Sequence, residues 1–296
     1  MDRTEAVRPL PGPNEAAGHG SERAAADPVI SLRGATLAYG DRVLWHGLDL
    51  DVWPGEFLAV LGPNGSGKTS LLRVLLGRQQ LSEGTLLILG HAPRRGSRHL
   101  GYVPQQTFQP AHALLRACDL VRLGMDGHRW GLPLTRRTVR HRVDELLASV
   151  GATPYADVPL GRLSGGEQQR VRVAQALATD PRILLCDEPL LSLDPQHQRT
   201  IAGLVAERRR SAGTAVVFVT HEINPVLGLV DRVLYLARGG YRIGPPDAVM
   251  TSSTLSELYG TQVDVVRVRG RIVVVGAPGA GTGHTHADHA EEGESR

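Results

Sequence analysis

The sequence contains almost no lysine. Of its 33 basic side chains, 32 are arginine, and Lys68 is the single lysine among 296 residues. Arginine replaces lysine wherever a solvated positive charge suffices, but its planar fork does not fit where a compact ammonium is required. We therefore expect Lys68 to occupy a place that needs a small cation, although a compositional bias alone would also empty the other positions.

Cysteine and long apolar runs are also scarce. The two cysteines, Cys118 and Cys186, lie far apart and have neither zinc-binding spacing nor the pattern of a disulfide framework. No run approaches the roughly 18–20 apolar residues that cross a bilayer, and no apolar segment follows the N-terminus as in a secretory signal. We therefore expect a soluble cytoplasmic chain with room for one large α/β domain or two small ones.

Charge is distributed unevenly along the chain. The net charge is +3, but residues 1–27 and 277–296 are each net acidic, so the region between them is basic. A basic surface suits nucleic acid or the cytoplasmic face of a membrane. Scattered, solvated arginines explain the same balance equally well.

Both ends of the chain are predicted to be disordered. Residues 1–27 and 277–296 are rich in Pro, Gly, Ala and charge and show no apolar periodicity. The second segment carries His284, His286 and His289, and neutral imidazoles suit a divalent ion such as zinc. A merely polar tail is the alternative.

Between the tails, strand-like runs alternate with helical ones, which predicts an α/β fold with a largely parallel sheet. Residues 111–150 have helical spacing, with an amphipathic helix over Arg136–Val150, and a β-hairpin is expected over Val263–Val275 around Gly270. The predicted strands are Val29–Leu32, Phe57–Leu61, His99–Val103, Ile183–Cys186, Ala215–Val219 and Val233–Ala237.

Lys68 lies in the pattern G-x-x-x-x-G-K-[ST], which is typical of phosphate-binding loops. An apolar strand precedes the loop and a helical pattern over Ser70–Leu76 follows it, so main-chain N–H groups and the helix N-terminus would face an anion. Lys68 would reach the terminal phosphates and the Thr69 hydroxyl would bind Mg²⁺. A glycine turn without a ligand is the alternative. The predicted nucleotide-binding residues here are Gly62, Pro63, Asn64, Gly65, Ser66, Gly67, Lys68, Thr69 and Ser70.

A second motif is the apolar run from Ile183 that ends in Asp187 and Glu188. At a sheet edge beside a phosphate loop, Asp187 is placed to hold Mg²⁺ and Glu188 to polarise the attacking water. A strand followed by an acidic turn without a ligand is the alternative.

A third motif, Leu163–Arg170, contains Ser164, Gly165 and Gly166 and opens a helix predicted over Gln168–Leu177. Ser164 is a candidate helix cap, and a serine with two glycines at a helix start forms a second anion site. Two such sites for one nucleotide favour a head-to-tail dimer in which each chain closes the other's Lys68 site. A capped surface helix is the alternative.

With these motifs in this order, the chain resembles the ATP-binding subunit of an ABC transporter over roughly Val29 to Met250. The resemblance implies a P-loop NTPase core with a mostly parallel sheet, an antiparallel β subdomain and an inserted helical subdomain. Residues 28–262 would be the ABC ATPase domain, with a helical insertion at about 107–165, and residues 263–276 an accessory β-hairpin.

The resemblance also implies roles for single residues. Tyr39 would stack on adenine, and Gln105 would touch Mg²⁺ and the attacking water and sense a membrane partner. Asp194, in the run Ser192–Asp194, would cross the dimer interface, and His221 would contact the γ-phosphate. Together with Lys68 and Glu188, Gln105 and His221 complete the predicted catalytic set, and the predicted Mg²⁺ ligands are Thr69, Gln105 and Asp187.

The implied cofactors are ATP and Mg²⁺. The implied partners are a second copy of the chain, integral membrane permease subunits and, indirectly, an extracytoplasmic metal-binding protein, and no nucleic-acid partner is expected. The ATPase would sit on the inner face of the cell membrane. The runs Gly101–Gln105 and His221–Val226 most resemble the zinc/manganese uptake group. An iron–siderophore or cobalamin importer, or a non-transport ABC ATPase acting on nucleic acid, are the alternatives.

Overall fold

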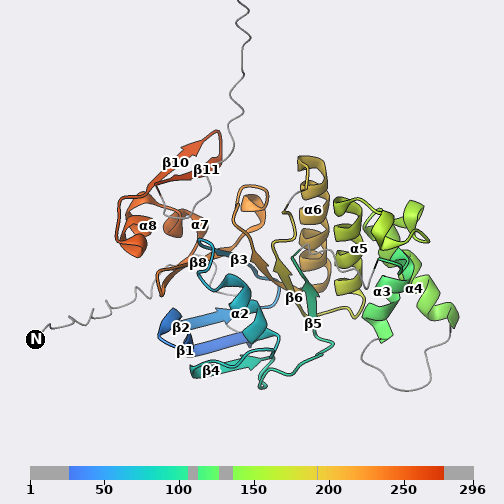
Figure 1. Ribbon diagram of the computed structural model, residues 1–296, viewed down its shortest axis with the longest axis horizontal. Coiled ribbons are helices and arrows are strands. Elements are labelled where there is room, and N and C mark those ends of the chain that lie inside the picture. Colours follow the sequence, from blue (N-terminus) through green and yellow to red (C-terminus); the bar gives the residue numbers. More distant parts are fainter. Residues whose placement is uncertain (1–26, 106–112, 127–135, 192, 277–296) are drawn as a thin grey trace, which may run out of the picture.

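A six-stranded sheet forms the centre of the computed structural model, which describes residues 27–105, 113–126, 136–191 and 193–276 (Figure 1). The strand order is β5-β6-β7-β3-β8-β9, with β9 antiparallel to β8 and the other pairs parallel. Every residue of β3, β6 and β7 is buried, as continuous apolar strands covered on both faces should be. The strands are β3 (Phe57–Leu61), β5 (Leu100–Val103), β6 (Ile183–Asp187), β7 (Ala215–Val219), β8 (Arg232–Ala237) and β9 (Gly240–Gly244).

A three-stranded antiparallel sheet covers one face of the central sheet. Its order is β2-β1-β4, with β1 at Ile30–Tyr39, β2 at Arg42–Val52 and β4 at Glu83–Ile88. Helix α2 (Lys68–Leu75) packs its apolar side into the same core as both sheets. We call this group of buried residues the inter-sheet core, and it holds the helix that begins with Lys68.

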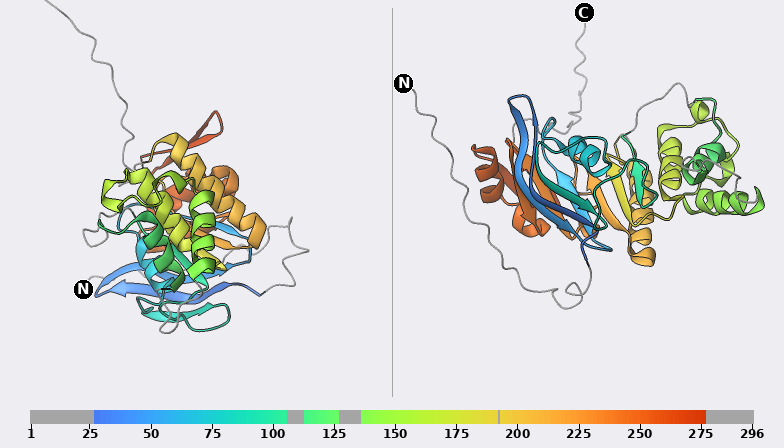
Figure 2. Two further views of the ribbon diagram at one scale, coloured as in Figure 1. Left: turned by 90° about the vertical axis from the view of Figure 1, so that its right-hand side faces the viewer. Right: turned by 90° about the horizontal axis from the view of Figure 1, so that it is seen from below.

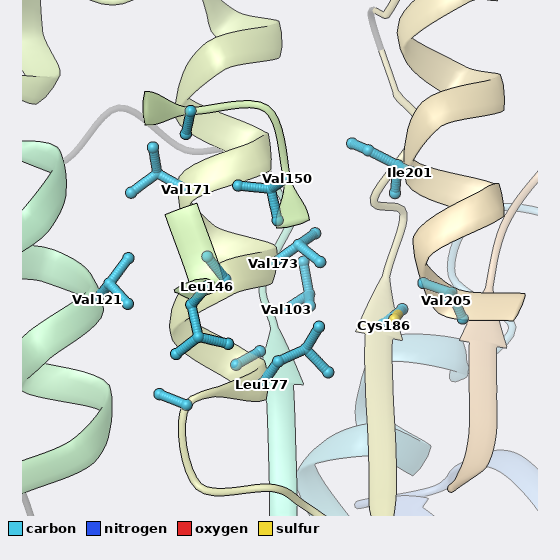
Figure 3. Packing of buried hydrophobic residues seen from close by; sticks show 14 of the residues in the cluster. Val103, Val121, Leu146, Val150, Val171, Val173, Leu177, Cys186, Ile201 and Val205 are labelled. Carbon is cyan, nitrogen blue, oxygen red and sulfur yellow. The ribbon is translucent and has the colours of Figure 1, made fainter. Parts of the chain in front are cut away.

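Helices cover the opposite face of the central sheet. Figure 3 shows side chains of α3, α5 and α6 packing with Val103 of β5 and Cys186 of β6. Alternation along β6 divides the two faces, because Leu184 and Cys186 point to these helices while Leu185 points to the inter-sheet core. We call this second group the helical core. Its helices are α3 (Ala117–Asp126), α4 (Arg136–Ser149), α5 (Gly165–Leu177) and α6 (Pro195–Ala212), with short 3₁₀ turns at Thr153–Tyr155 and Leu160–Arg162.

The C-terminal elements pack against β8 and form a third core, here called the C-terminal core. It contains α7 (Pro246–Val249), α8 (Ser252–Tyr259) and a hairpin of β10 (Asp264–Val268) and β11 (Arg271–Val275). A 3₁₀ turn, Leu227–Leu229, precedes β8. The right-hand view of Figure 2 shows this unit at one end of the molecule and helices α3 and α4 at the other.

The predicted fold class is confirmed, and all six predicted strands are present. The first is longer than predicted, since it runs to Tyr39, and β2, β4 and β9 were not predicted. The predicted helix over Arg136–Val150 ends one residue earlier, and a hairpin turns at Gly270, which has φ 77°. The predicted tails, residues 1–27 and 277–296, lie outside the described residues apart from Asp27. Among the described helices, none has both the length and the apolar character needed to cross a bilayer.

Candidate functional site

The phosphate-loop motif forms a tight turn between β3 and α2. Gly62, Gly65 and Gly67 have φ values of 142°, 78° and 96°, in the range that favours glycine. A Cβ on Gly62 would lie 2.1 Å from the carbonyl oxygen of Leu236 in β8, so a side chain has no room there. The predicted strand–loop–helix unit is therefore present, and the main chain passes directly over the end of the central sheet.

Lys68 lies in the first turn of α2 with 6% of its surface exposed. Its Nζ donates to the carbonyl oxygens of Gly62 at 2.7 Å and Pro63 at 3.0 Å. Burial lowers the pKa of Lys68, and the charges of Glu188 and Asp187 oppose this effect. The ammonium is thus held inside its own loop, a space that suits a compact cation better than a planar guanidinium.

Asp187 and Thr69 meet beside Lys68. The Thr69 hydroxyl donates to Oδ1 of Asp187 at 3.3 Å, and the Tyr102 hydroxyl lies 3.5 Å from Oδ2. Burial raises the pKa of Asp187, and the hydrogen bond from Thr69 partly offsets this. A hydroxyl and a carboxylate are oxygen ligands of the kind that Mg²⁺ prefers, so these residues fit the predicted ion. Tyr102 was not among the predicted site residues.

Gln105 and His221 converge on Glu188. Nε2 of Gln105 donates to Oε2 of Glu188 at 3.2 Å, and Nδ1 of His221 lies 3.7 Å from the same oxygen. Gln105 follows β5, His221 follows β7 and Glu188 follows β6. They meet because the carboxyl ends of these parallel strands lie at one edge of the sheet. A cavity of about 130 Å³ opens beside Glu188 and His221 and is also lined by Gln198.

The backbone of Glu188 adopts a left-handed conformation with φ 46°. Such a conformation costs of order 1–3 kcal/mol in a non-glycine residue and persists where surrounding contacts enforce it. Here the main-chain N–H of Glu188 donates to the carbonyl of Val219 at 3.0 Å. In this conformation, at the end of the buried strand, the Glu188 side chain meets Gln105 and His221.

Tyr39 ends β1 with about half of its side chain exposed, as a stacking surface requires. Its hydroxyl donates to Oε1 of Gln79 at 2.7 Å, and a hydrogen bond with Ser70 is the main cause that lowers its pKa. Arg42 donates to the carbonyl of Gly65 at 3.0 Å. Neither Gln79 nor Arg42 lies within one of the sequence motifs, so the sequence did not predict them as site residues.

Ser164 caps helix α5. Its hydroxyl accepts from the main-chain N–H of Glu167 at 3.3 Å, and Oε2 of Glu167 accepts from the N–H of Ser164 at 2.8 Å. The predicted cap is confirmed, and the helix begins at Gly165, three residues earlier than Gln168, because this capping box allows Gly165 and Gly166 to form the first turn.

The two predicted anion sites lie on different sides of the central sheet. Helix α5 packs in the helical core and α2 in the inter-sheet core, and Figure 1 shows them well apart. The structure therefore does not bring Ser164 to the Lys68 loop within one chain.

Asp194 caps helix α6. Oδ1 accepts from the N–H groups of Gln196 at 2.9 Å and His197 at 3.0 Å, and Oδ2 pairs with the His197 ring. The hydrogen bond with His197 lowers the pKa of Asp194. The sequence did not predict this capping, and Ser192 lies outside the described residues.

Comparisons with known proteins identify relatives with the same kind of domain. Residues 45–191 match the family model described as "ABC transporter". The chain is 32% identical over 258 residues to the zinc import ATP-binding protein ZnuC of Halorhodospira halophila, covering 87% of this chain and 89% of that protein. It is 38% identical over 269 residues to the phosphonates import ATP-binding protein PhnC of Anaeromyxobacter dehalogenans, where it spans 87% of this chain but only 53% of the relative.

Solved structures of ABC transporter cassettes are also similar to this chain. A dimeric bacterial ABC transporter cassette superposes with a TM-score of 0.64 at 30% identity, covering 73% of this chain and 98% of that one. Other relatives are named for import of spermidine/putrescine and of Fe(3+), so the named substrates differ among them.

The fold and the site define a P-loop nucleotidase of the ABC ATPase type. The chain belongs to the ABC transporter family, as its similarity to a zinc import ATP-binding protein over nearly the whole of that relative shows.

Proposed function

We propose that the chain is the ATP-hydrolysing subunit of an ABC importer for a divalent metal cation, zinc or manganese. The observation that carries the ATPase part is the convergence of Gln105 and His221 on Glu188 beside the Asp187–Thr69 pair. Such a cluster positions a water and a γ-phosphate without forming a covalent intermediate.

In this proposal the loop Gly62–Ser70 binds the phosphates of ATP through main-chain N–H groups, and Tyr39 stacks on adenine. Thr69, Asp187 and Gln105 would hold Mg²⁺, which when bound neutralises phosphate charge. Lys68 exchanges its contacts with the Gly62 and Pro63 carbonyls for phosphate oxygens.

Hydrolysis itself depends on Glu188 and His221. Glu188 orients the attacking water and accepts its proton, and His221 donates a hydrogen bond to the γ-phosphate. The preorganised donors act where charge develops in the transition state.

A second copy of the chain completes each site. Ser164, Gly165 and Gly166 of one copy would face the γ-phosphate held by the other, and Asp194 would lie at the interface. The placement of α2 and α5 on opposite faces of the sheet supports this head-to-tail arrangement, because one chain cannot close its own site.

Import of a divalent metal is the finer part of the proposal. It is supported by the similarity to the zinc import ATP-binding protein and by the runs Gly101–Gln105 and His221–Val226. Permease subunits in the membrane and an extracytoplasmic metal-binding protein would select the ion, with the ATPase on the cytoplasmic face. The Fe(3+) import relative favours an iron importer as the second candidate.

The test combines hydrolysis with metal content. We expect Glu188→Gln to retain ATP binding while Mg²⁺-dependent hydrolysis falls about 10²–10⁴-fold, the usual contribution of a positioned base. In the source cells, deletion of the gene for this chain should lower zinc or manganese accumulation. Expression of the wild-type chain should restore the accumulation, and expression of Glu188→Gln should not.

Two results would redirect the proposal. Unchanged zinc and manganese with altered iron would favour the second candidate. ATP hydrolysis stimulated by DNA, with affinity that falls steeply with salt, would replace transport with a nucleic-acid role.

A further inference from the structure

The loop that carries His221 is fixed on its N-terminal side by Thr220. The N–H of Thr220 donates to the carbonyl of Val60 in β3 at 3.1 Å. The Thr220 hydroxyl accepts from the N–H of Glu222 at 3.1 Å and donates to the carbonyl of Glu222 at 2.8 Å. These bonds hold the start of the loop against the central sheet.

On its C-terminal side, the loop is fixed by Asn224. Nδ2 of Asn224 donates to the carbonyl of Ile272 at 2.9 Å, and its Oδ1 accepts from the N–H of Ile272 at 2.8 Å. One side-chain amide thus pairs both main-chain groups of a single residue in β11. Because Ile272 directs both groups away from β10, Asn224 occupies the open edge of the hairpin as a further strand would.

The hairpin is in turn held by the C-terminal unit. Ile272 is 4% exposed and shares the C-terminal core with Ile223 of the His221 loop. The Ser252 hydroxyl of α8 accepts from the N–H of Val265 at 2.8 Å, and Arg267 pairs with Asp247 of α7 at 2.6 Å. The hairpin is therefore held by several contacts, so removing one of them, such as the Ser252 bond, leaves it in place.

The loop presents His221 to Glu188. Its side chain is 52% exposed, and its contact with Glu188 is 3.7 Å long, so contacts of the ring alone fix it weakly. The main chain between Thr220 and Asn224 must set where the ring lies. A displacement of about 1 Å at such a group is enough to lower a rate roughly 100-fold.

We propose that Asn224 is a positioning residue that fixes His221 through the C-terminal hairpin, which makes the hairpin a working part of the hydrolysis site. The proposal rests on the proposed ATPase function for its effect on rate. Asn224 acts through the loop main chain and through Ile272, and it does not touch the nucleotide.

The test is Asn224→Ala with Ser252→Ala as its matched control. Both variants remove side-chain hydrogen bonds to the hairpin, but only Asn224 joins it to the His221 loop. We expect Asn224→Ala to lower kcat by about tenfold or more at unchanged KM for ATP, since a misplaced group weakens only the transition state. Ser252→Ala should lower thermal stability and leave kcat near the wild-type value.

A second readout does not depend on hydrolysis. In the nucleotide-free protein, the His221 ring signals in NMR, assigned by comparison with His221→Gln, should shift or broaden in Asn224→Ala and remain unchanged in Ser252→Ala. If the wild-type chain hydrolyses no ATP, the proposed function fails and these signals alone decide the role of Asn224.

An active Asn224→Ala enzyme with wild-type kcat would overturn the proposal. An equal loss of kcat in Ser252→Ala would also overturn it, because hairpin stability rather than the link to His221 would then be the cause. If the wild-type chain hydrolyses no ATP, unchanged NMR signals of His221 in Asn224→Ala would overturn the proposal.

Discussion

Asp187 is a carboxylate with 2% of its surface exposed at the end of a fully buried strand. The hydroxyls of Thr69 and Tyr102 approach it, yet burial dominates and raises its pKa. A buried carboxylate whose pKa is raised destabilises the folded chain wherever it is ionised. The site thus carries a cost without a bound cation, which Mg²⁺ binding would relieve.

We therefore expect Asp187→Asn to stabilise the nucleotide-free protein at neutral pH while abolishing Mg²⁺-dependent hydrolysis. The folded pKa of Asp187 lies above its unfolded value, so the wild-type cost is present above the folded pKa and disappears as the pH falls toward the unfolded value near 3.8. Thermal midpoints shift by roughly 2–4 °C per kcal/mol in domains of comparable size.

Thermal unfolding of both proteins from pH 8 to pH 4, without nucleotide, provides the measurement. The midpoint of Asp187→Asn should exceed that of the wild type at pH 8, and the difference should shrink as the pH falls. A lower midpoint of the variant at neutral pH would show that burial of the charge is not the dominant effect.

At the residue scale, the sequence predicted those site residues that lie in contiguous motifs. Lys68, Thr69, Asp187 and Glu188 could be placed because spacing beside an apolar strand fixes where a side chain emerges. The contact of Tyr102 with Asp187 and the bond of Asn224 to Ile272 could not, since they join segments 85 and 48 residues apart and depend on tertiary packing.

At the scale of single elements, helix α5 has a dual requirement at its first residues. Ser164 caps the helix through Glu167, and the proposed dimer uses the same hydroxyl toward a phosphate. We expect Ser164→Ala to lower the free energy of unfolding by about 1 kcal/mol, the usual loss of a serine cap, and to reduce ATP hydrolysis as well. Denaturant unfolding and a hydrolysis assay measure the two effects.

Thr251 provides a matched control, because its hydroxyl caps α8 by accepting from the N–H of Thr254 at 3.2 Å. Thr251→Ala should cost a similar stability and leave hydrolysis unchanged. Equal loss of hydrolysis in both variants would reduce Ser164 to a structural cap.

Complete burial makes a strand easy to predict from the sequence. Strands β3, β6 and β7 are continuous apolar runs and were predicted with nearly correct bounds. Strand β4 buries only two of six residues and β9 is half-buried throughout, so neither has a clear apolar period. Their pairing with β1 and β8 supplies what the local sequence lacks.

At the scale of the whole molecule, the fold separates the two proposed half-sites of the nucleotide site. Lys68, Glu188 and His221 meet at the carboxyl edge of the central sheet, while Ser164 lies at the start of a helix in the helical core. From two anion-binding motifs and one nucleotide, the sequence predicted a head-to-tail dimer in which each chain closes the other's site. A second copy is the economical way to unite them, because a head-to-tail pair brings unlike surfaces together twice.

The molecular mass of Glu188→Gln with and without ATP tests this composite site most directly. With ATP and Mg²⁺, sedimentation equilibrium should give about twice the 31.8 kDa of one chain, and without nucleotide the single-chain mass. Adding Ser164→Arg should restore the single-chain mass at saturating ATP, since the arginine would block the partner's site. A single-chain mass of Glu188→Gln at saturating ATP, or a doubled mass that persists with Ser164→Arg, would contradict the account.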